Sequence, residues 1–116
     1  MSAAEVRAAL AAAASTVDGI NCSAYYRQST KAGDAMVRRN GTNYPNSLGG
    51  VITWQVLINM PTDLAAAQRF LDDVVPLVVA ALEDVLQIRS VTPQQLQYET
   101  GLVPGAVIEG LRAEDD

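Results

Sequence analysis

Side chains that could do chemistry are few in this sequence, and they do not form a catalytic set. Two acidic pairs are adjacent in the chain, Asp72-Asp73 and Glu83-Asp84. Neighbouring residues of a helix do not face each other, so these carboxylates suit a solvated helix surface better than general acid and base catalysis. The chain has no histidine and one cysteine, which leaves it without a His-based triad, a Cys/His zinc site or a disulfide framework. We therefore expect no enzyme activity, no metal and no cofactor.

Two adjacent arginines, Arg38 and Arg39, are the best candidates for binding an anion. A guanidinium can bind a phosphate or a carboxylate through paired hydrogen bonds. Together with Tyr25 and Tyr26, these arginines would line a pocket if the chain were a small ligand-binding or enzymatic α+β domain, and we keep that as an alternative. The single Cys22 is expected to be a small buried apolar residue, because no histidine is present to activate it as a nucleophile.

The charge of the chain is unevenly distributed. Eight basic and thirteen acidic residues give a net charge of −5, which argues against non-specific DNA binding by the whole surface. The segment 21–60 is basic, and the segments before and after it are acidic. In a protein that self-assembles, such a split could align the middle of one subunit with the tail of a neighbour. Scattered surface charge of little consequence is the other interpretation.

The length and composition fit one globular domain. The 116 residues are 49% hydrophobic and 18% charged, which argues against wholesale disorder. The longest apolar run, residues 74–82, contains Pro76 and is too short to cross a bilayer. The alanine-rich start lacks the basic front of a signal peptide, and Glu5 stands where a positive charge is expected. We expect a soluble protein of the cytoplasm that contacts no membrane.

Local patterns in the first forty residues predict one helix and two strands. Residues 2–17 fit an amphipathic helix, with Ser2 as the N-cap and Glu5 completing a capping box. Residues 20–29 alternate loosely between two faces, which indicates a half-buried strand. A turn separates them from a second short strand at residues 35–39.

A long polar stretch comes next, followed by the clearest strand of the sequence. Residues 40–50 contain Pro45 and two closing glycines, so we expect a loop that is mobile in the free subunit and ordered in an assembly. Residues 51–60 alternate strictly between an apolar and a mixed face, which predicts a strand with Trp54 in the core.

The second half of the chain predicts a long helix and further strands. Thr62 is the expected N-cap of the helix, and Pro76 predicts a kink or break near residues 72–75. The helix is apolar on almost every side after that point, which implies burial by more than one neighbour. Residues 88–91 and 94–99 are candidate strands separated by a Thr-Pro pair.

The C-terminal end predicts one more strand and a tail. Residues 102–112 alternate, and residues 113–116 form an acidic tail that we expect to be disordered. The fold class is therefore α+β, with residues 1–112 forming a single domain in which an antiparallel sheet is covered by two helices, in the order α-β-β-β-α-β-β. The expected core residues are Trp54, Val56, Ile58, Phe70, Leu71, Val78 and Leu82.

The order of these elements, together with the texture of three segments, resembles a known family. The segments are VITWQVLINM at residues 51–60, PTDLAAAQRFLDD at 61–73 and PGAVIEG at 104–110. The chain resembles the tail terminator (tail completion) proteins of long-tailed bacteriophages, particularly those of actinobacteria. Arginine outnumbers lysine seven to one, a bias typical of the GC-rich genomes of such hosts. The resemblance spans nearly the whole chain and includes no signature motif.

The resemblance implies a structural function in the virion. A tail terminator forms a hexameric ring that caps the last ring of the tail tube, stops its polymerisation and offers a surface to the head-tail connector proteins. The implied partners are further copies of the chain, the major tail tube protein and the connector, and DNA passes through the lumen without specific binding. The implied location is the tail-neck region of the virion, assembled in the host cytoplasm. Another neck protein, such as a stopper or adaptor, is the closest alternative.

Contacts with other subunits or with the tube are expected from the basic middle of the chain and from the polar stretch after it. The family has no invariant motif that assigns an individual contact. The residues that we expect at such contacts are Arg27, Lys31, Arg38, Arg39, Asn43, Tyr44 and Pro45.

Overall fold

The protein forms a single α+β domain with the expected order of elements. The computed structural model describes residues 1–46 and 49–114. Its elements are α1 (Ala3–Ser15), β1 (Asn21–Ser23), β2 (Asp34–Asn46), β3 (Gly49–Asn59), α2 (Leu64–Asp73), α3 (Val75–Leu82), β4 (Gln87–Tyr98) and β5 (Gly101–Ala113). The predicted long helix is thus present in two parts, α2 and α3.

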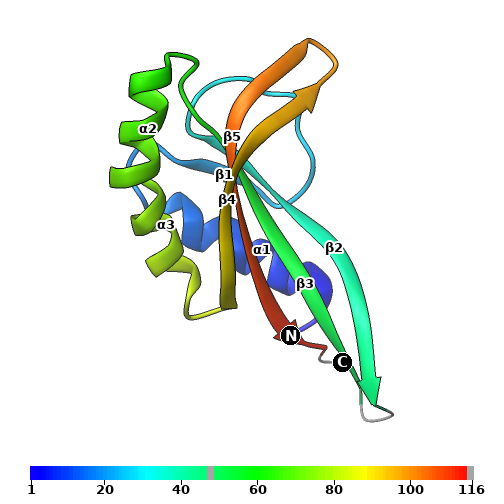
Figure 1. Ribbon diagram of the computed structural model, residues 1–116. Helices are drawn as coiled ribbons and strands as arrows, with labels where there is room; N and C mark the ends of the chain where they lie inside the picture. Colours follow the sequence, from blue (N-terminus) through cyan, green and yellow to red (C-terminus); the bar gives the residue numbers. More distant parts are fainter. Residues whose placement is uncertain (47–48, 115–116) are drawn as a thin grey trace.

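All strands belong to one five-stranded sheet in the order β1-β2-β3-β5-β4. The short β1 runs parallel to β2, and the other neighbours are antiparallel. In Figure 1, α2 and α3 stand along one side of the strands while α1 crosses behind them. The far ends of β2 and β3 project beyond the helices (Figure 1), and we call this projection, residues 40–46 and 49–51, the arm.

The three helices cover one face of the sheet and bury the main core against it. Alternate residues of β3 point to this face, because successive side chains of a strand point to opposite sides. Five of the predicted core residues are fully buried there, and two, on the outer turns of α2, are half-buried against it. The buried five are Trp54, Val56, Ile58, Val78 and Leu82, and the half-buried two are Phe70 and Leu71.

Helix capping follows the sequence at α1 and differs by one residue at α2. Ser2 Oγ accepts from the Glu5 N–H at 3.2 Å while Glu5 Oε1 accepts from the Ser2 N–H at 3.0 Å, so the predicted capping box is confirmed. At α2 the predicted cap Thr62 is wrong. Asp63 is the N-cap, because its carboxylate accepts from the Ala66 N–H at 2.9 Å.

The break predicted by Pro76 is confirmed. The first helix segment ends at Asp73 and the next begins at Val75, with Pro76 in its first turn. A proline lacks the backbone N–H that an unbroken helix would need at this point, and it is tolerated where a new helix begins. The break lets α2 and α3 follow different parts of the sheet.

The prediction of a loop at residues 40–50 is wrong for residues 40–46, 49 and 50, which belong to two paired strands. Residues 40–46 continue β2, and Gly49 begins β3, with Thr42 opposite Ile52 and Asn43 opposite Val51. Neither face of the arm is buried by a helix, so polar side chains are tolerated on both sides and the hydrophobic alternation of a strand is absent. Residues 47 and 48 lie outside the described part of the chain.

The predicted strand at residues 20–29 is wrong in length. The strand β1 ends at Ser23, and the chain then leaves the sheet as a loop, residues 24–33, before it enters β2. The loop lies beside the end of β4 at Tyr98, since Gln28 Oε1 accepts from the Glu99 N–H at 3.3 Å. A loop therefore replaces the second half of the expected strand.

Two predictions near the C-terminus also need correction. The strand β4 is continuous through Pro93 instead of split by it, which an edge strand permits because one of its sides needs no backbone partner. The expectation of a disordered tail from residue 113 is wrong for Ala113 and Glu114. Ala113 is the last residue of β5, and the Glu114 N–H donates to the Gly50 carbonyl at 2.8 Å. Residues 115 and 116 lie outside the described part of the chain.

Candidate binding groove

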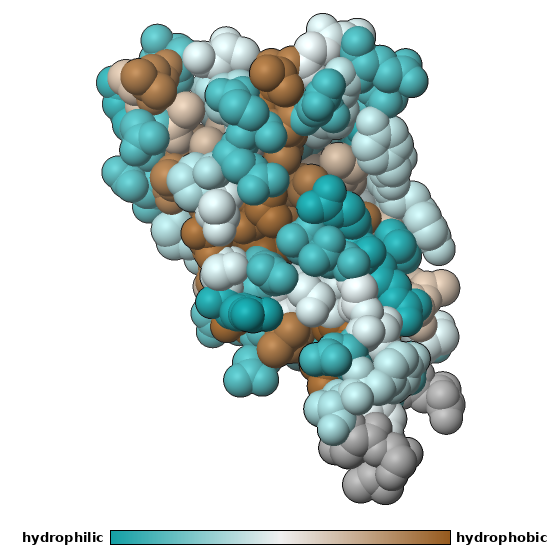
Figure 2. Space-filling view, turned by 45° about the vertical axis from the view of Figure 1, so that its right-hand side comes forward, coloured by the Kyte–Doolittle hydropathy of each residue, from teal (hydrophilic) through white to brown (hydrophobic). Residues whose placement is uncertain are grey.

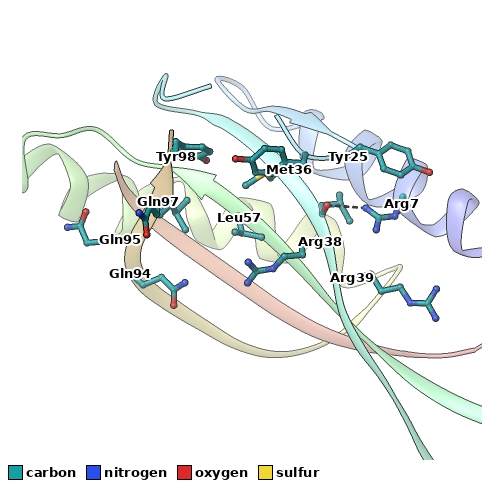
Figure 3. A pocket seen from close by; sticks show the side chains of 13 residues that line it. Arg7, Tyr25, Met36, Arg38, Arg39, Leu57, Gln94, Gln95, Gln97 and Tyr98 are labelled. Atoms are coloured by element: carbon teal, nitrogen blue, oxygen red, sulfur yellow. Dashed lines mark hydrogen bonds between the residues drawn. The ribbon is translucent and has the colours of Figure 1, made fainter. Parts of the chain in front are cut away.

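The face of the sheet that the helices leave uncovered carries a groove. A small apolar cluster lies on this face and includes Met36, Leu57 and Val107. The loop 24–33 and the β4 strand border the cluster, and between them is a cavity of about 480 Å³. Figure 3 shows the side chains that line it, which come from α1, β2, β3, β4 and the loop; the ends of Arg39 and Tyr25 are directed away from its centre. The lining residues are Arg7, Tyr25, Tyr26, Met36, Val37, Arg38, Arg39, Leu57, Gln94, Gln95, Leu96, Gln97 and Tyr98.

Arg7 connects the helix α1 to the loop at one end of the groove. Its Nη1 donates to the Ala24 carbonyl at 3.1 Å and to the Val37 carbonyl at 3.2 Å. Its guanidinium lies 4.7 Å from the ring centre of Tyr25 and 5.5 Å from that of Trp54, within the range of cation–π attraction. Arg7 therefore holds the start of the loop and the Tyr25 ring in place.

Asn59 holds the other end of the same loop. This residue is 1% exposed, and its Nδ2 donates to the carbonyls of Ser29 at 2.7 Å and Lys31 at 3.2 Å. Its Oδ1 accepts from the Tyr98 hydroxyl at 2.6 Å. Burial raises the pKa of Tyr98 above its ordinary value, with the hydrogen bond between Tyr98 and Asn59 acting in the opposite direction. The loop is thus tied to both β3 and β4, which gives the groove a defined wall.

Arg38 and Arg39 differ in how their charges are paired. Arg38 Nε donates to Gln55 Oε1 at 2.8 Å, and no carboxylate among residues 1–46 and 49–114 lies within ion-pair distance of it. Arg39 Nη2 donates to Thr42 Oγ1 at 2.8 Å and lies 3.9 Å from Glu114 Oε2. Arg38 is therefore the cationic group of the groove that has the most capacity left for an anionic partner.

The four residues that the sequence suggests for a pocket do come together. Tyr25, Tyr26, Arg38 and Arg39 all line the groove, and the two tyrosines are 60% and 62% exposed. Sequence reasoning missed Arg7, whose only signal is that it is the one basic residue of an alanine-rich helix. It also missed the glutamines of β4, at positions 94, 95 and 97, whose signal is a run of exposed amides in a strand.

The other expected contact residues lie elsewhere. Arg27 is occupied within the chain, since its Nη2 lies 3.2 Å from Asp34 Oδ2 and its Nη1 donates to Ser23 Oγ at 3.1 Å. Lys31 is exposed in the loop, and its carbonyl accepts from Asn59. The remaining three are exposed residues of the arm, away from the groove. They are Asn43, Tyr44 and Pro45.

The arm holds Tyr44 in a defined position. A Cβ added at Gly50 would lie 2.8 Å from Tyr44 Cε1, so the ring lies across the glycine of the neighbouring strand. The Tyr44 hydroxyl donates to Glu114 Oε2 at 3.4 Å, yet the residue is 62% exposed. Figure 2 shows the end of the molecule that carries the arm as mainly hydrophilic, whereas hydrophobic residues reach the surface in the body. Tyr44 is thus an ordered aromatic side chain on a polar projection.

Cys22 is buried, as the sequence predicts. Burial raises the pKa of its thiol to about 11, with the nearby charge of Arg27 acting in the opposite direction. At neutral pH the sulfur is therefore a protonated thiol and a poor nucleophile. Within residues 1–46 and 49–114, no cluster of three or more Cys, Asp or Glu side chains could hold a metal ion. No helix in the described ranges is long and apolar enough to span a membrane.

The chain matches no protein-family model, and a search of curated proteins finds no significant match. Its groove is therefore interpreted from its own side chains. Guanidinium groups at one end, amides along β4 and an apolar floor at Met36 and Leu57 suit a partner that carries carboxylates beside apolar groups. The exposed tyrosines at the rim offer flat apolar area with a polar end, which is typical of binding surfaces.

Proposed function

We propose that this protein is a structural subunit of a bacteriophage tail, which assembles into a ring that caps the tail tube, ends its polymerisation and joins the tail to the head connector. The resemblance of the sequence to tail terminators suggests this function, and the α+β fold with its order of elements is consistent with it. In the proposed ring, DNA passes through the lumen without specific binding. Acidic residues, which dominate the chain with a net charge of −5, would let it slide instead of adhere.

The observation that carries the proposal is the arm. The molecule measures 47 Å along its longest axis and 28 Å and 21 Å across, and the arm projects beyond the helices at one end (Figure 1). Asn43, Tyr44 and Pro45 expose their side chains there. An ordered projection that adds little to the core of its own domain is suited to reaching another subunit or the tube.

Assembly on tail tubes tests the proposal. The purified chain is mixed with the major tail tube protein encoded in the same genome, the tubes are imaged by electron microscopy, and native mass spectrometry measures the mass of the ring. We expect tubes that end in a ring of identical subunits and that are shorter than tubes grown alone. A chain that stays monomeric and leaves tube length unchanged contradicts the proposal.

A variant of the arm tests the observation on which the proposal rests. Tyr44→Ala removes the exposed ring, and Tyr44→Phe is the matched control that keeps it. We expect the alanine variant to fold normally and to fail to cap tubes, because exposed aromatic anchors contribute most of the energy at many interfaces. The phenylalanine variant should cap tubes as the parent does. Equal capping by all three proteins would show that the arm makes no essential contact.

One observation favours a second candidate function, ligand binding. The groove unites Arg38, Arg39, Tyr25 and Tyr26 on one face of a single chain, as a small ligand-binding domain would require. An anion-binding assay on the parent and on the Arg38→Ala/Arg39→Ala double variant separates the two functions. Binding of a small carboxylate that the double variant loses supports the second candidate. Loss of assembly without any ligand supports the first.

A further inference from the structure

The helix layer carries an exposed surface whose chemistry is the reverse of that of the groove. Its helices and the residues that follow them expose four carboxylates, in two pairs along the chain, Asp72-Asp73 and Glu83-Asp84, and Leu77 lies between the pairs in the sequence with 57% of its surface exposed. None of these four carboxylates forms an ion pair or hydrogen bond within the described part of the chain. We call these five residues the acidic helix surface.

Of the acidic helix surface, Leu77 also lines a shallow apolar hollow. Val74, Leu77 and Ala81 of the helices line it together with Val17 and Asp18, which follow α1, and its volume is about 390 Å³. Exposed apolar area beside unpartnered charges is unusual for a face that contacts only water. The apolar side chain of Leu77 could pack on the apolar floor of the groove, and the carboxylates carry the charge opposite to that of the guanidinium groups in the groove.

We propose that the groove of one copy receives the acidic helix surface of a second copy, with a carboxylate meeting Arg38 and Leu77 lying over Met36 and Leu57. This inference rests on the proposed function, because it names the contact between neighbouring subunits of the ring. Charge complementarity argues for a second copy as the occupant. The groove is basic, and the same chain presents an acidic surface with an apolar centre on its other side.

The positions of the two surfaces determine the kind of assembly. The helices cover one face of the sheet, and the groove lies on the opposite face. Each copy therefore offers a groove on one side and an acidic helix surface on the other, and the contact joins unlike surfaces. Contacts of this heterologous kind repeat from copy to copy and close into a ring when the rotation between copies allows it. The exposed rings of Tyr25 and Tyr26 would border the contact on the groove side.

Cysteine trapping in the full chain tests the contact directly. One preparation carries Tyr26→Cys in the groove, a second carries Leu77→Cys, and the two are mixed under mild oxidation and analysed by denaturing gel. We expect a covalent dimer from the mixture and little from either preparation alone, because the proposed contact joins unlike surfaces. Leu64→Cys is the matched control, since Leu64 is 77% exposed at the other end of the helix layer. The proposal fails if Leu77→Cys traps no more dimer than Leu64→Cys.

Charge reversal provides a second measurement. Arg38→Glu should lower the yield of trapped dimer by about tenfold, the effect of losing a close charge pair at an interface. Adding Asp73→Arg or Asp84→Arg to the Leu77→Cys partner should restore the yield. Arg89→Glu makes the same change of net charge at an exposed site outside the groove and should leave the yield unchanged. An equal loss with Arg89→Glu would mean that only overall charge matters, and the proposal would fail.

The outcomes separate this inference from the proposed function. Trapping between Tyr26→Cys and Leu77→Cys without any capping of tail tubes supports the contact and rejects the tail function. Capped tubes without trapping support the tail function and reject the contact. A third outcome is that a small carboxylate such as 4-hydroxyphenylacetate shifts the NMR resonances of Arg38 and Tyr25 while no dimer is trapped. This outcome assigns the groove to a ligand and also rejects the contact.

Discussion

The two faces of the same sheet are built in different ways. On the helix side, Trp54, Ile58 and Leu82 are completely buried within one continuous core. On the open side, a cluster of six buried residues lies under a loop, beside a cavity with an arginine-rich rim. Trp54 and Leu57 are only three positions apart in β3 and belong to opposite faces. Both faces therefore share their backbone and differ only in what covers them.

This difference indicates where stability and binding reside. The helix side excludes water with well-packed apolar groups, so its residues determine the free energy of folding. The open side includes a partly buried row of polar partners, in which Arg38 donates to Gln55 and Ser90 donates to Glu109 at 3.4 Å. Such groups contribute little to folding and remain available to a partner. Three predictions test this division.

The largest expected effect is on the helix side. Trp54→Ala should lower the free energy of unfolding by about 3–5 kcal/mol, because it removes a large, fully buried side chain and leaves a cavity. Urea denaturation followed by circular dichroism measures the change. If the variant unfolds at the parent's urea concentration and only fails to assemble, Trp54 belongs to an interface, and the contrast between the two faces is wrong.

An effect of intermediate size is expected from Cys22, which also belongs to the core on the helix side. Burial raises the pKa of its thiol from the ordinary 9.0 to about 11. The unfolded chain releases this proton above pH 9 and the folded chain retains it, so stability that is present below pH 9 is lost as the pH rises to 11. The expected loss from this group is roughly 2–3 kcal/mol.

Urea denaturation at pH 8 and pH 11 measures this loss. Cys22→Ala is the control, since a variant without the thiol should show a smaller decrease over the same range. Its baseline stability at pH 8 is expected to be lower, because a buried side chain has been shortened. An identical decrease in both proteins would mean that other groups cause the alkaline destabilisation and that Cys22 is more accessible than the structure indicates.

The helix side could be predicted from the sequence to a large extent. The strict alternation around Trp54 gives the strand, because a face buried by helices must be apolar at every second position. The capping box at Ser2 and the break at Pro76 are local in origin, since they depend on residues within one helical turn. Only the position of the cap on α2 differed, by a single residue.

The open side could be predicted only in part. The groove joins Arg7 to residues 94–97, and contacts over such a separation have no local signal. The arm was missed because its strands are held by backbone pairing, which is compatible with polar side chains on both faces. Residues 24–29 alternate as a strand would, but Arg7 and Asn59 hold them as a loop through the carbonyls of Ala24 and Ser29, outside the pairing of the sheet. The sequence indicates Arg38, Arg39, Tyr25 and Tyr26 as binding residues only because arginine and tyrosine are side chains suited to binding.

The smallest expected effect is on the open side, at the hydroxyl of Tyr98. Tyr98→Phe removes the donor at 2.6 Å from Asn59 Oδ1 and leaves a buried acceptor unsatisfied, which should lower the free energy of unfolding by about 1–2 kcal/mol. The variant should also lose less stability at high pH than the parent, because the raised pKa of Tyr98 opposes ionisation in the folded state. Tyr26→Phe is the control, since Tyr26 is exposed and should change stability by less than about 0.5 kcal/mol.

Hydrogen exchange in residues 24–33 should rise in Tyr98→Phe alone, because Asn59 connects Tyr98 to this loop. Unchanged exchange there would mean that Arg7 holds the loop without help from Asn59, and that the wall of the groove depends on α1 and not on the sheet.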